Sequence, residues 1–273
     1  MVHRLHLIVL SLALAALASF LQIEAIVLDI HLPLETDHVS TKCPYSQSLT
    51  SNLALRRAFD SSECIDLLDL HVAHLTLYQA AFDLETTANG TTAVDPKKLD
   101  RFLGALRDAA QEVLPQCDVS LVPTIDMKGA YAMWPVNSTD CLQTLSDEIV
   151  DAMAEFISRP PPVPDWIYQL PEPERTRKMG MVERYGSPNV FGEFEPHVTV
   201  SYNMNTTAID RGAILDRFGD RMPRPCDGLI RHVAVGRTGV GGSVLRRGVI
   251  DVFPLRPNDG PIRGDRIQAS KFI

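Results

Sequence analysis

Apolar runs separated by short polar segments predict strands and helices that alternate along the chain. Segments 25–34 and 70–80 predict strands, and 46–59 predicts a helix between them. Asp95 followed by Pro96 predicts a helix start, because Asp caps helices and proline suits their first position. Segments 119–125 and 130–136 predict a hairpin around 127–129, and 141–157 predicts an amphipathic helix capped by Thr139 or Asp140.

The second half of the chain opens with the one clear break in composition, a proline-rich segment at about 159–190. Proline fits poorly in helix interiors and central strands, so this segment predicts a loop or linker. Strands are predicted at 198–204, 229–235 and 244–253, with a helix from Thr206 or Thr207 to Phe218. This mixture of helices and hairpins predicts an α+β fold with two antiparallel sheets.

The N-terminus has the pattern of a signal peptide, with a short basic start and a long apolar run. Ala16-Leu17-Ala18 fits a cleavage site, so residues 1–18 are the expected signal, and Ala25 is a second option. The protein is then expected to be secreted or to reside in the lumen of the secretory pathway, with no membrane attachment after cleavage. The alternative is an uncleaved signal that anchors the protein in a membrane.

Glycosylation sequons and cysteines agree with secretion. The sequons begin at Asn89, Asn137 and Asn205, and each lies in a predicted loop. An oxidising compartment favours disulfide bonds, although their connectivity cannot be deduced from sequence. If each disulfide encloses one compact element, Cys43 pairs with Cys64 and Cys117 pairs with Cys141, and Cys226 has no partner. No C-x-x-C spacing indicates a zinc site.

Charge is unevenly distributed along the chain, whose formal net charge is −8. The chain from residue 211 onward contains 12 Lys and Arg and 6 Asp and Glu, whereas residues 19–210 contain 13 Lys and Arg and 28 Asp and Glu. The basic C-terminal part can meet an anionic ligand or simply form a solvated surface. The overall profile is not that of a protein that coats duplex nucleic acid.

Two apolar, strand-like runs carry the same polar pair, His74-x-Thr76 and His197-x-Thr199. Because side chains alternate on a strand, each His shares a face with its Thr while the aliphatic residues face the core. His38-x-Ser40 has the same spacing but lies in a polar stretch, so we interpret it as background.

Two such pairs lining opposite walls of one cleft would suit phosphate ester chemistry. A neutral imidazole can take a proton from attacking water, and a protonated one can give a proton to the leaving oxygen. Threonine hydroxyls can donate hydrogen bonds to phosphate oxygens. This chemistry requires neither a metal nor another cofactor, and the sequence does not decide which His is the acid.

The segments HLTL at 74–77 and HVTV at 197–200 resemble the paired signature of the two-histidine (2H) phosphoesterases. These include bacterial 2′-5′ RNA ligase-like proteins and cyclic nucleotide phosphodiesterases of plants and yeast. The resemblance spans about 25–255 and implies two pseudo-symmetric lobes of antiparallel sheet with outer helices and an active cleft between them. Residues 19–273 would form one bilobed domain with the proline-rich segment as an insertion.

The resemblance also implies an activity, namely hydrolysis or transesterification of 2′,3′-cyclic phosphates, 2′-5′ linkages or RNA ends. His74 and His197 would be catalytic, with Thr76 and Thr199 binding the phosphate. The ligand would be a nucleotide or a short RNA-like phosphodiester rather than duplex DNA. One alternative is a catalytically silent nucleotide- or RNA-binding module of the same fold. The natural substrate and the oligomeric state stay open.

Other candidates have two interpretations each. Tyr78 and Tyr202 either stack on a base or pack within the fold. A metal-dependent hydrolase would use both motif histidines as ligands together with Asp69 or Glu195. His71, three residues before His74, falls on the other face of a strand, and we interpret it as a packed structural residue. The cations of the proline-rich segment either clamp phosphate or are solvated: Arg175, Arg177 and Lys178.

Overall fold

The computed structural model describes residues 25–35, 37–59, 65–88, 91–202 and 224–257. Several predictions fall outside these residues: the signal peptide at 1–18, the sequons at Asn89 and Asn205, Cys64, and the helix ending at Phe218. The remaining sequon, Asn137, lies in the described part and is exposed.

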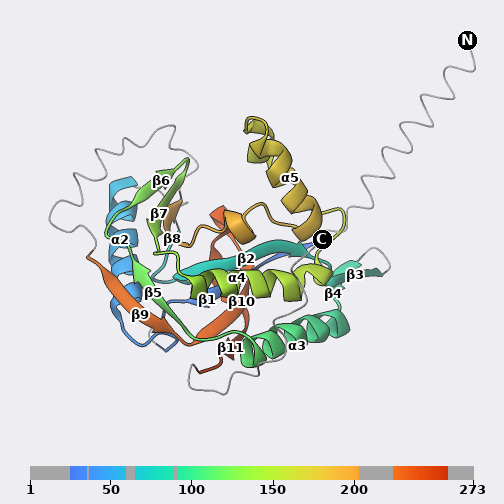
Figure 1. Cartoon of the computed structure of the whole chain (residues 1–273), viewed down its shortest axis with the longest axis horizontal. Coiled ribbons are helices and arrows are strands. Elements are labelled where there is room, and N and C mark those ends of the chain that lie inside the picture. Colours follow the sequence, from blue (N-terminus) through green and yellow to red (C-terminus); the bar gives the residue numbers. More distant parts are fainter. Residues whose placement is uncertain (1–24, 36, 60–64, 89–90, 203–223, 258–273) are drawn as a thin grey trace, which may run out of the picture.

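A seven-stranded antiparallel sheet forms the centre of the molecule (Figure 1). Its order is β11 (Val244–Pro254), β10 (His232–Thr238), β1 (Ile26–Pro33), β2 (His74–Phe82), β8 (His197–Tyr202), β7 (Tyr131–Pro135) and β6 (Asp126–Lys128). Two small antiparallel sheets pair β3 (Glu85–Ala88) with β4 (Thr91–Val94) and β5 (Cys117–Leu121) with β9 (Cys226–Ile230). The predicted α+β class with antiparallel sheets is therefore confirmed, and one sheet contains both histidine strands.

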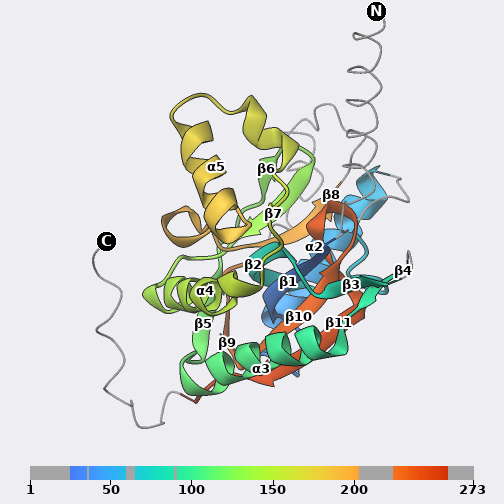
Figure 2. The same ribbon diagram turned by 90° about the vertical axis from the view of Figure 1, so that its right-hand side faces the viewer.

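Four α-helices accompany these sheets in the described residues: α2 (Cys43–Phe59), α3 (Pro96–Glu112), α4 (Asp140–Met153) and α5 (Glu174–Tyr185). Figures 1 and 2 place α3 and α5 at opposite ends of the molecule, with the central sheet between them. The Asp95 carboxylate accepts a hydrogen bond from the Lys97 N–H at 2.9 Å, and Thr139 Oγ1 accepts one from the Leu142 N–H at 3.2 Å. Both predicted N-caps are thus confirmed. None of the described helices has the length and apolar character needed to cross a membrane.

Two strand predictions are wrong in detail, and one hairpin was missed. The hairpin around Gly129 joins β6 to β7, whereas β5 pairs with β9, more than 100 residues further along the chain. The expected strand at 229–235 is two strands, because β9 and β10 belong to different sheets and separate at Arg231. The β3–β4 hairpin was not predicted.

The proline-rich segment contains a helix where a loop was expected. Helix α5 follows Pro173 and ends at Gly186, which adopts the left-handed conformation with φ of 70°. Proline at a helix start and glycine just after its end are ordinary boundary signals, so the prolines delimit α5 instead of excluding it.

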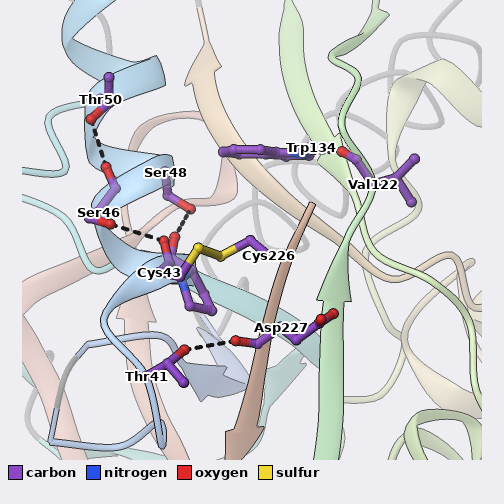
Figure 3. Close-up of a disulfide and its surroundings, with 10 residues drawn as sticks. Thr41, Cys43, Ser46, Ser48, Thr50, Val122, Trp134, Cys226 and Asp227 are labelled. Atoms are coloured by element: carbon purple, nitrogen blue, oxygen red, sulfur yellow. Dashed lines mark hydrogen bonds between the residues drawn. A yellow bond between two sulfur atoms is a disulfide. The ribbon is translucent and has the colours of Figure 1, made fainter. Parts of the chain in front are cut away.

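One of the two expected disulfides is confirmed and the other is wrong. Cys117 pairs with Cys141, but Cys43 pairs with Cys226 and not with Cys64 (Figure 3). The segment before α2 runs along β9, where Thr41 Oγ1 donates a hydrogen bond to the Asp227 carbonyl at 2.7 Å. This tertiary contact brings Cys43 next to the first residue of β9. Two disulfides are typical of a protein that folds in an oxidising compartment.

Candidate active site

The pairing of β2 with β8 brings the two His-x-Thr motifs together. Leu75 lies opposite Val198 in antiparallel register, and both side chains are fully buried. Since side chains alternate, the residues flanking these two point to the other face, and the antiparallel direction sets His74 across from Thr199. Side chains facing each other in this way are typically about 5 Å apart at Cβ. The motifs therefore meet on adjacent strands of one sheet and not on opposite walls.

Both motif histidines are held in the same tautomer by backbone carbonyls. His74 Nδ1 lies 2.8 Å from the Val72 carbonyl oxygen, and His197 Nδ1 lies 2.7 Å from the carbonyl oxygen of Glu195. A carbonyl only accepts, so each Nδ1 carries a hydrogen and donates it. The Nε2 atom of each neutral imidazole is then left with its lone pair for a ligand.

Burial keeps both imidazoles neutral in the free protein. It lowers the pKa of His74 to about 4, against an opposing effect of the Asp29 carboxylate. Burial also lowers the pKa of His197, whereas its hydrogen bond to the Glu195 carbonyl acts in the opposite direction. Near neutral pH both Nε2 atoms can accept a proton, and an imidazole that acts as acid must first gain one, which a bound anion would favour.

A carboxylate that the sequence analysis missed lies beneath this pair. Asp29 on β1 is fully buried, and its Oδ2 accepts hydrogen bonds from Thr76 Oγ1 at 2.7 Å and Gln79 Nε2 at 3.1 Å. The same oxygen lies 3.9 Å from His74 Nε2. His31, also on β1, stacks edge to face on His74 with ring centroids 5.0 Å apart. The signal was present in the sequence, because Asp-Ile-His repeats the period of two within an otherwise apolar strand.

The two threonines have different surroundings. The Thr76 hydroxyl directs its hydrogen to Asp29, so it is not free to donate to a phosphate while that bond persists. Thr199 is half-buried, and among the described residues its hydroxyl has no hydrogen-bond partner. Thr199 is thus the better placed of the two as a donor to a ligand.

A hollow opens beside His197 at the edge formed by β6, β7 and the start of β8. Its lining is mixed polar and apolar: Asp126, Lys128, Met133, Pro135, Glu195, Pro196 and His197. Lys128 and Glu195 form an exposed ion pair in this hollow. His74 does not line it and is only 7% exposed, so the two histidines differ in their access to solvent.

The tyrosines of the motif strands differ as well. Tyr78 is buried on the opposite face of β2, and its hydroxyl donates to the Tyr185 carbonyl, which is the packing alternative. Burial raises the pKa of this hydroxyl above its ordinary value. Tyr202 is half-buried at the end of β8, with its ring 4.6 Å from that of Tyr131. Only Tyr202 has the exposure that contact with a base would need.

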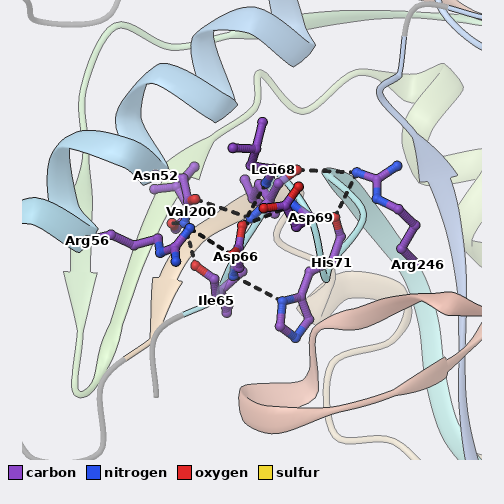
Figure 4. Close-up of polar contacts among 10 residues, drawn as sticks. Asn52, Arg56, Ile65, Asp66, Leu68, Asp69, His71, Val200 and Arg246 are labelled. Carbon is purple, nitrogen blue, oxygen red and sulfur yellow. Dashed lines mark hydrogen bonds and ion pairs between the residues drawn. The ribbon is translucent and has the colours of Figure 1, made fainter. Parts of the chain in front are cut away.

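His71 has a structural role, as predicted, although it precedes β2 and is not part of it (Figure 4). Its Nδ1 accepts a hydrogen bond from the Asp66 N–H at 3.0 Å, and its carbonyl accepts one from Arg246 at 3.1 Å. The Asp69 N–H donates to the Asp66 carboxylate within the same turn. No group of three or more His, Cys, Asp or Glu side chains in the described part of the chain has an arrangement that suits a metal ion.

The cations of the proline-rich segment belong to α5 and have acidic partners. Arg175 pairs with Glu172, while Arg177 and Lys178 both pair with Glu193. Lys178 is buried and also bonds to the Asn189 side chain at 2.9 Å. These contacts show that the three residues hold α5 in place. The structure therefore does not support the interpretation that they clamp a phosphate.

Comparisons with known proteins give one family model and several solved structures. The model is described as a protein of unknown function, DUF1045, and matches residues 91–225. A search of curated proteins found no match. The structure is similar to TT0787 of Thermus thermophilus at 13% identity and to E. coli LigT complexed with NADP+ at 11%, each with a TM-score of 0.46 and 85% of this chain covered. Those chains are covered to 100% and 99%. Both TM-scores are below 0.5, so any assignment of activity depends on the residues of the site.

Proposed function

We propose that the protein is a metal-independent phosphodiesterase that uses His74 and His197 as its acid–base pair. The observation that carries the proposal is the register of Leu75 opposite Val198, which sets both His-x-Thr motifs on one face. The matched tautomers support it further, since in each ring Nδ1 donates to a backbone carbonyl and Nε2 keeps its lone pair. The substrates are 2′,3′-cyclic phosphates, 2′-5′ linkages or RNA ends, and the ligand is a nucleotide or a short RNA-like phosphodiester.

The chemistry needs two histidines with opposite tasks. One neutral imidazole removes a proton from attacking water, and the other, once protonated, supplies a proton to the leaving oxygen. The Thr199 hydroxyl donates a hydrogen bond to a non-bridging phosphate oxygen, and Thr76 lies at the equivalent position of the other motif. A positioned acid and a positioned base each contribute typically about 10²- to 10⁴-fold.

We infer that the chain forms one bilobed domain whose pseudo-twofold axis passes between β2 and β8. The order of the central sheet supports this, because β11, β10, β1 and β2 lie on one side of that axis and β8, β7 and β6 on the other. Each half then contributes one motif. We further propose secretion, for which the two disulfides and the expected signal at 1–18 are the support.

The second candidate function is a silent nucleotide- or RNA-binding module. One observation favours it: His74 is nearly inaccessible, and the Thr76 hydroxyl is already bonded to Asp29. A module of this kind would retain nucleotide binding through Thr199 and the hollow beside His197 without turnover.

Hydrolysis assays in the presence of EDTA, on 2′,3′-cyclic nucleotides and 2′-5′ oligonucleotides, separate these functions. We expect turnover by the native protein and a loss of at least 100-fold in both His74→Ala and His197→Ala. His38→Ala is the matched control, because it removes a histidine of the same spacing outside the site. Activity that survives both substitutions contradicts the proposal. Nucleotide binding without turnover supports the silent module, and a loss caused by EDTA alone supports a metal-dependent hydrolase.

A further inference from the structure

The two motif histidines differ in the charge that lies next to them. His74 Nε2 lies 3.9 Å from Asp29 Oδ2, and this carboxylate is 0% exposed. Glu195, two residues before His197, is exposed, and its charge is already neutralised by an ion pair with Lys128. A buried charge acts much more strongly on its neighbour than a solvated ion pair does.

Asp29 is placed where a carboxylate is unfavourable for stability. Its Oδ2 has two hydrogen-bond donors, whereas its Oδ1 is buried without a hydrogen-bond partner among the described residues and lies 3.4 Å from His31 Nδ1. Burying a charge with unfilled hydrogen-bonding capacity is costly, and such groups tend to serve function. The nearest candidates to receive its influence are the imidazoles of His31 and His74.

The hydrogen bonds around Asp29 fix the carboxylate oxygen that lies nearer to His74, while the other oxygen lies beside His31. Thr76 and Gln79 both donate to Oδ2, and Gln79 is itself held by the Gly242 carbonyl at 2.9 Å. The oxygen nearest to His74 is thus the one fixed by two donors. An oriented carboxylate stabilises the protonated form of an imidazole beside it, as it would in an acid catalyst.

We infer that Asp29 is a positioning residue that assigns the acid role to His74 and leaves the base role to His197. The inference deepens the proposed function and rests on it. His197 Nε2 takes a proton from water as the water oxygen bonds to phosphorus. The bond from phosphorus to the leaving ribose oxygen breaks, its electron pair stays on that oxygen, and His74 Nε2–H supplies the proton. Exchange of one proton by each histidine with solvent then restores the starting state.

The pH dependence of Asp29→Asn relative to the native protein tests this assignment. The titratable groups that face His74 are Asp29, His31 and His197, and the substitution removes one negative charge among them. An opposite charge at this range shifts a pKa by about 1–3 units, so kcat/KM at neutral and alkaline pH should fall at least tenfold. The deficit should shrink only as the pH falls below about 4, the pKa of His74 in the native protein, because the native ring is then already protonated and the variant ring begins to follow.

The opposite assignment predicts a different profile. A base at His74 would already be deprotonated near neutrality, so Asp29→Asn would change kcat/KM little there and raise it at acidic pH. That result would overturn the inference. Asp118→Asn, the same change on an exposed strand position, is the matched control. If Asp29 only stabilised the fold, Asp29→Asn would lower the unfolding temperature. We expect this substitution to leave the unfolding temperature unchanged or to raise it.

Two further measurements keep the inference testable if that variant folds poorly or if no turnover is found. A phosphodiester with a nitrophenolate leaving group needs no acid, so on it His74→Ala should lose far less activity than His197→Ala; equal losses contradict the assignment.

An NMR titration of the His74 ring requires no turnover. A lower His74 pKa in Asp29→Asn with no hydrolysis would end the proposed function but retain the coupling, and an unchanged pKa would end the coupling itself.

Discussion

Burial of the His74 side chain makes the stability of the protein depend on pH. The pKa of His74 is about 4 in the folded protein, against an ordinary value of 6.5 for the exposed ring. Between these two values the unfolded chain binds a proton at this position and the folded protein does not. Folding stability should therefore be complete above pH 6.5 and decline as the pH falls toward 4.

The His74 contribution can be isolated by substitution with asparagine, whose amide retains a hydrogen-bond donor for the Val72 carbonyl. Between pH 4 and 6.5 the native free energy of unfolding should rise by on the order of 3 kcal/mol more than that of His74→Asn. Urea denaturation at both pH values measures this difference. His71, His197 and His232 also have lowered pKa values, but they are common to both proteins and cancel. Parallel curves for the two proteins would contradict the burial of a neutral ring.

At the scale of single elements, the cap of α3 offers a clean measurement. Asp95 is a half-buried N-cap whose side chain accepts from the first turn, and Pro96 follows at the first helical position. Asp95→Ala should lower the free energy of unfolding by about 1 kcal/mol, because the orphan N–H groups of the first turn lose their acceptor. Thermal or urea unfolding measures the change, with Asp100→Ala on the exposed face of α3 as control. Equal effects of the two substitutions would show that the cap contributes nothing beyond loss of a charge.

Elements with local signals are the ones that the sequence predicts well. The caps at Asp95 and Thr139, the strand periodicity around His74 and His197, and the α+β class all follow from neighbouring residues. Partners that are distant in sequence are not encoded locally. The pairing of β5 with β9 and of Cys43 with Cys226 depends on how the whole chain folds.

The site shows the same division. The His-x-Thr pairs are visible because each lies within three residues, whereas Asp29 joins them only through the register of β1 with β2, in which His31 lies opposite Thr76. A bulge between Ile30 and His31 lets Gln79 face Asp29 in that register. The carboxylate that distinguishes the two histidines is therefore a property of the sheet and cannot be read from either motif.

At the scale of the whole molecule, the two disulfides constrain the unfolded chain to different extents. Cys43 and Cys226 are separated by 183 residues and join the start of α2 to β9, while Cys117 and Cys141 are separated by 24 and join β5 to the start of α4. Closing a longer loop removes more conformational entropy from the unfolded state, about 5 kcal/mol for the first bond and about 3 kcal/mol for the second.

The double variant Cys43→Ala/Cys226→Ala should therefore lose more stability than Cys117→Ala/Cys141→Ala in urea denaturation under oxidising conditions. Cys117 and Cys226 are buried in the same core as Leu75 and Val198, whose side chains point away from the His-x-Thr face, so each variant that remains folded should retain the native kcat/KM of the proposed hydrolysis. Peptide mapping of the unreduced native protein first establishes the two connections. A map that joins Cys43 to Cys64 would contradict the packing of the α2 start against β9. Equal losses of stability in the two double variants would show that native contacts, and not loop closure, determine what each disulfide contributes.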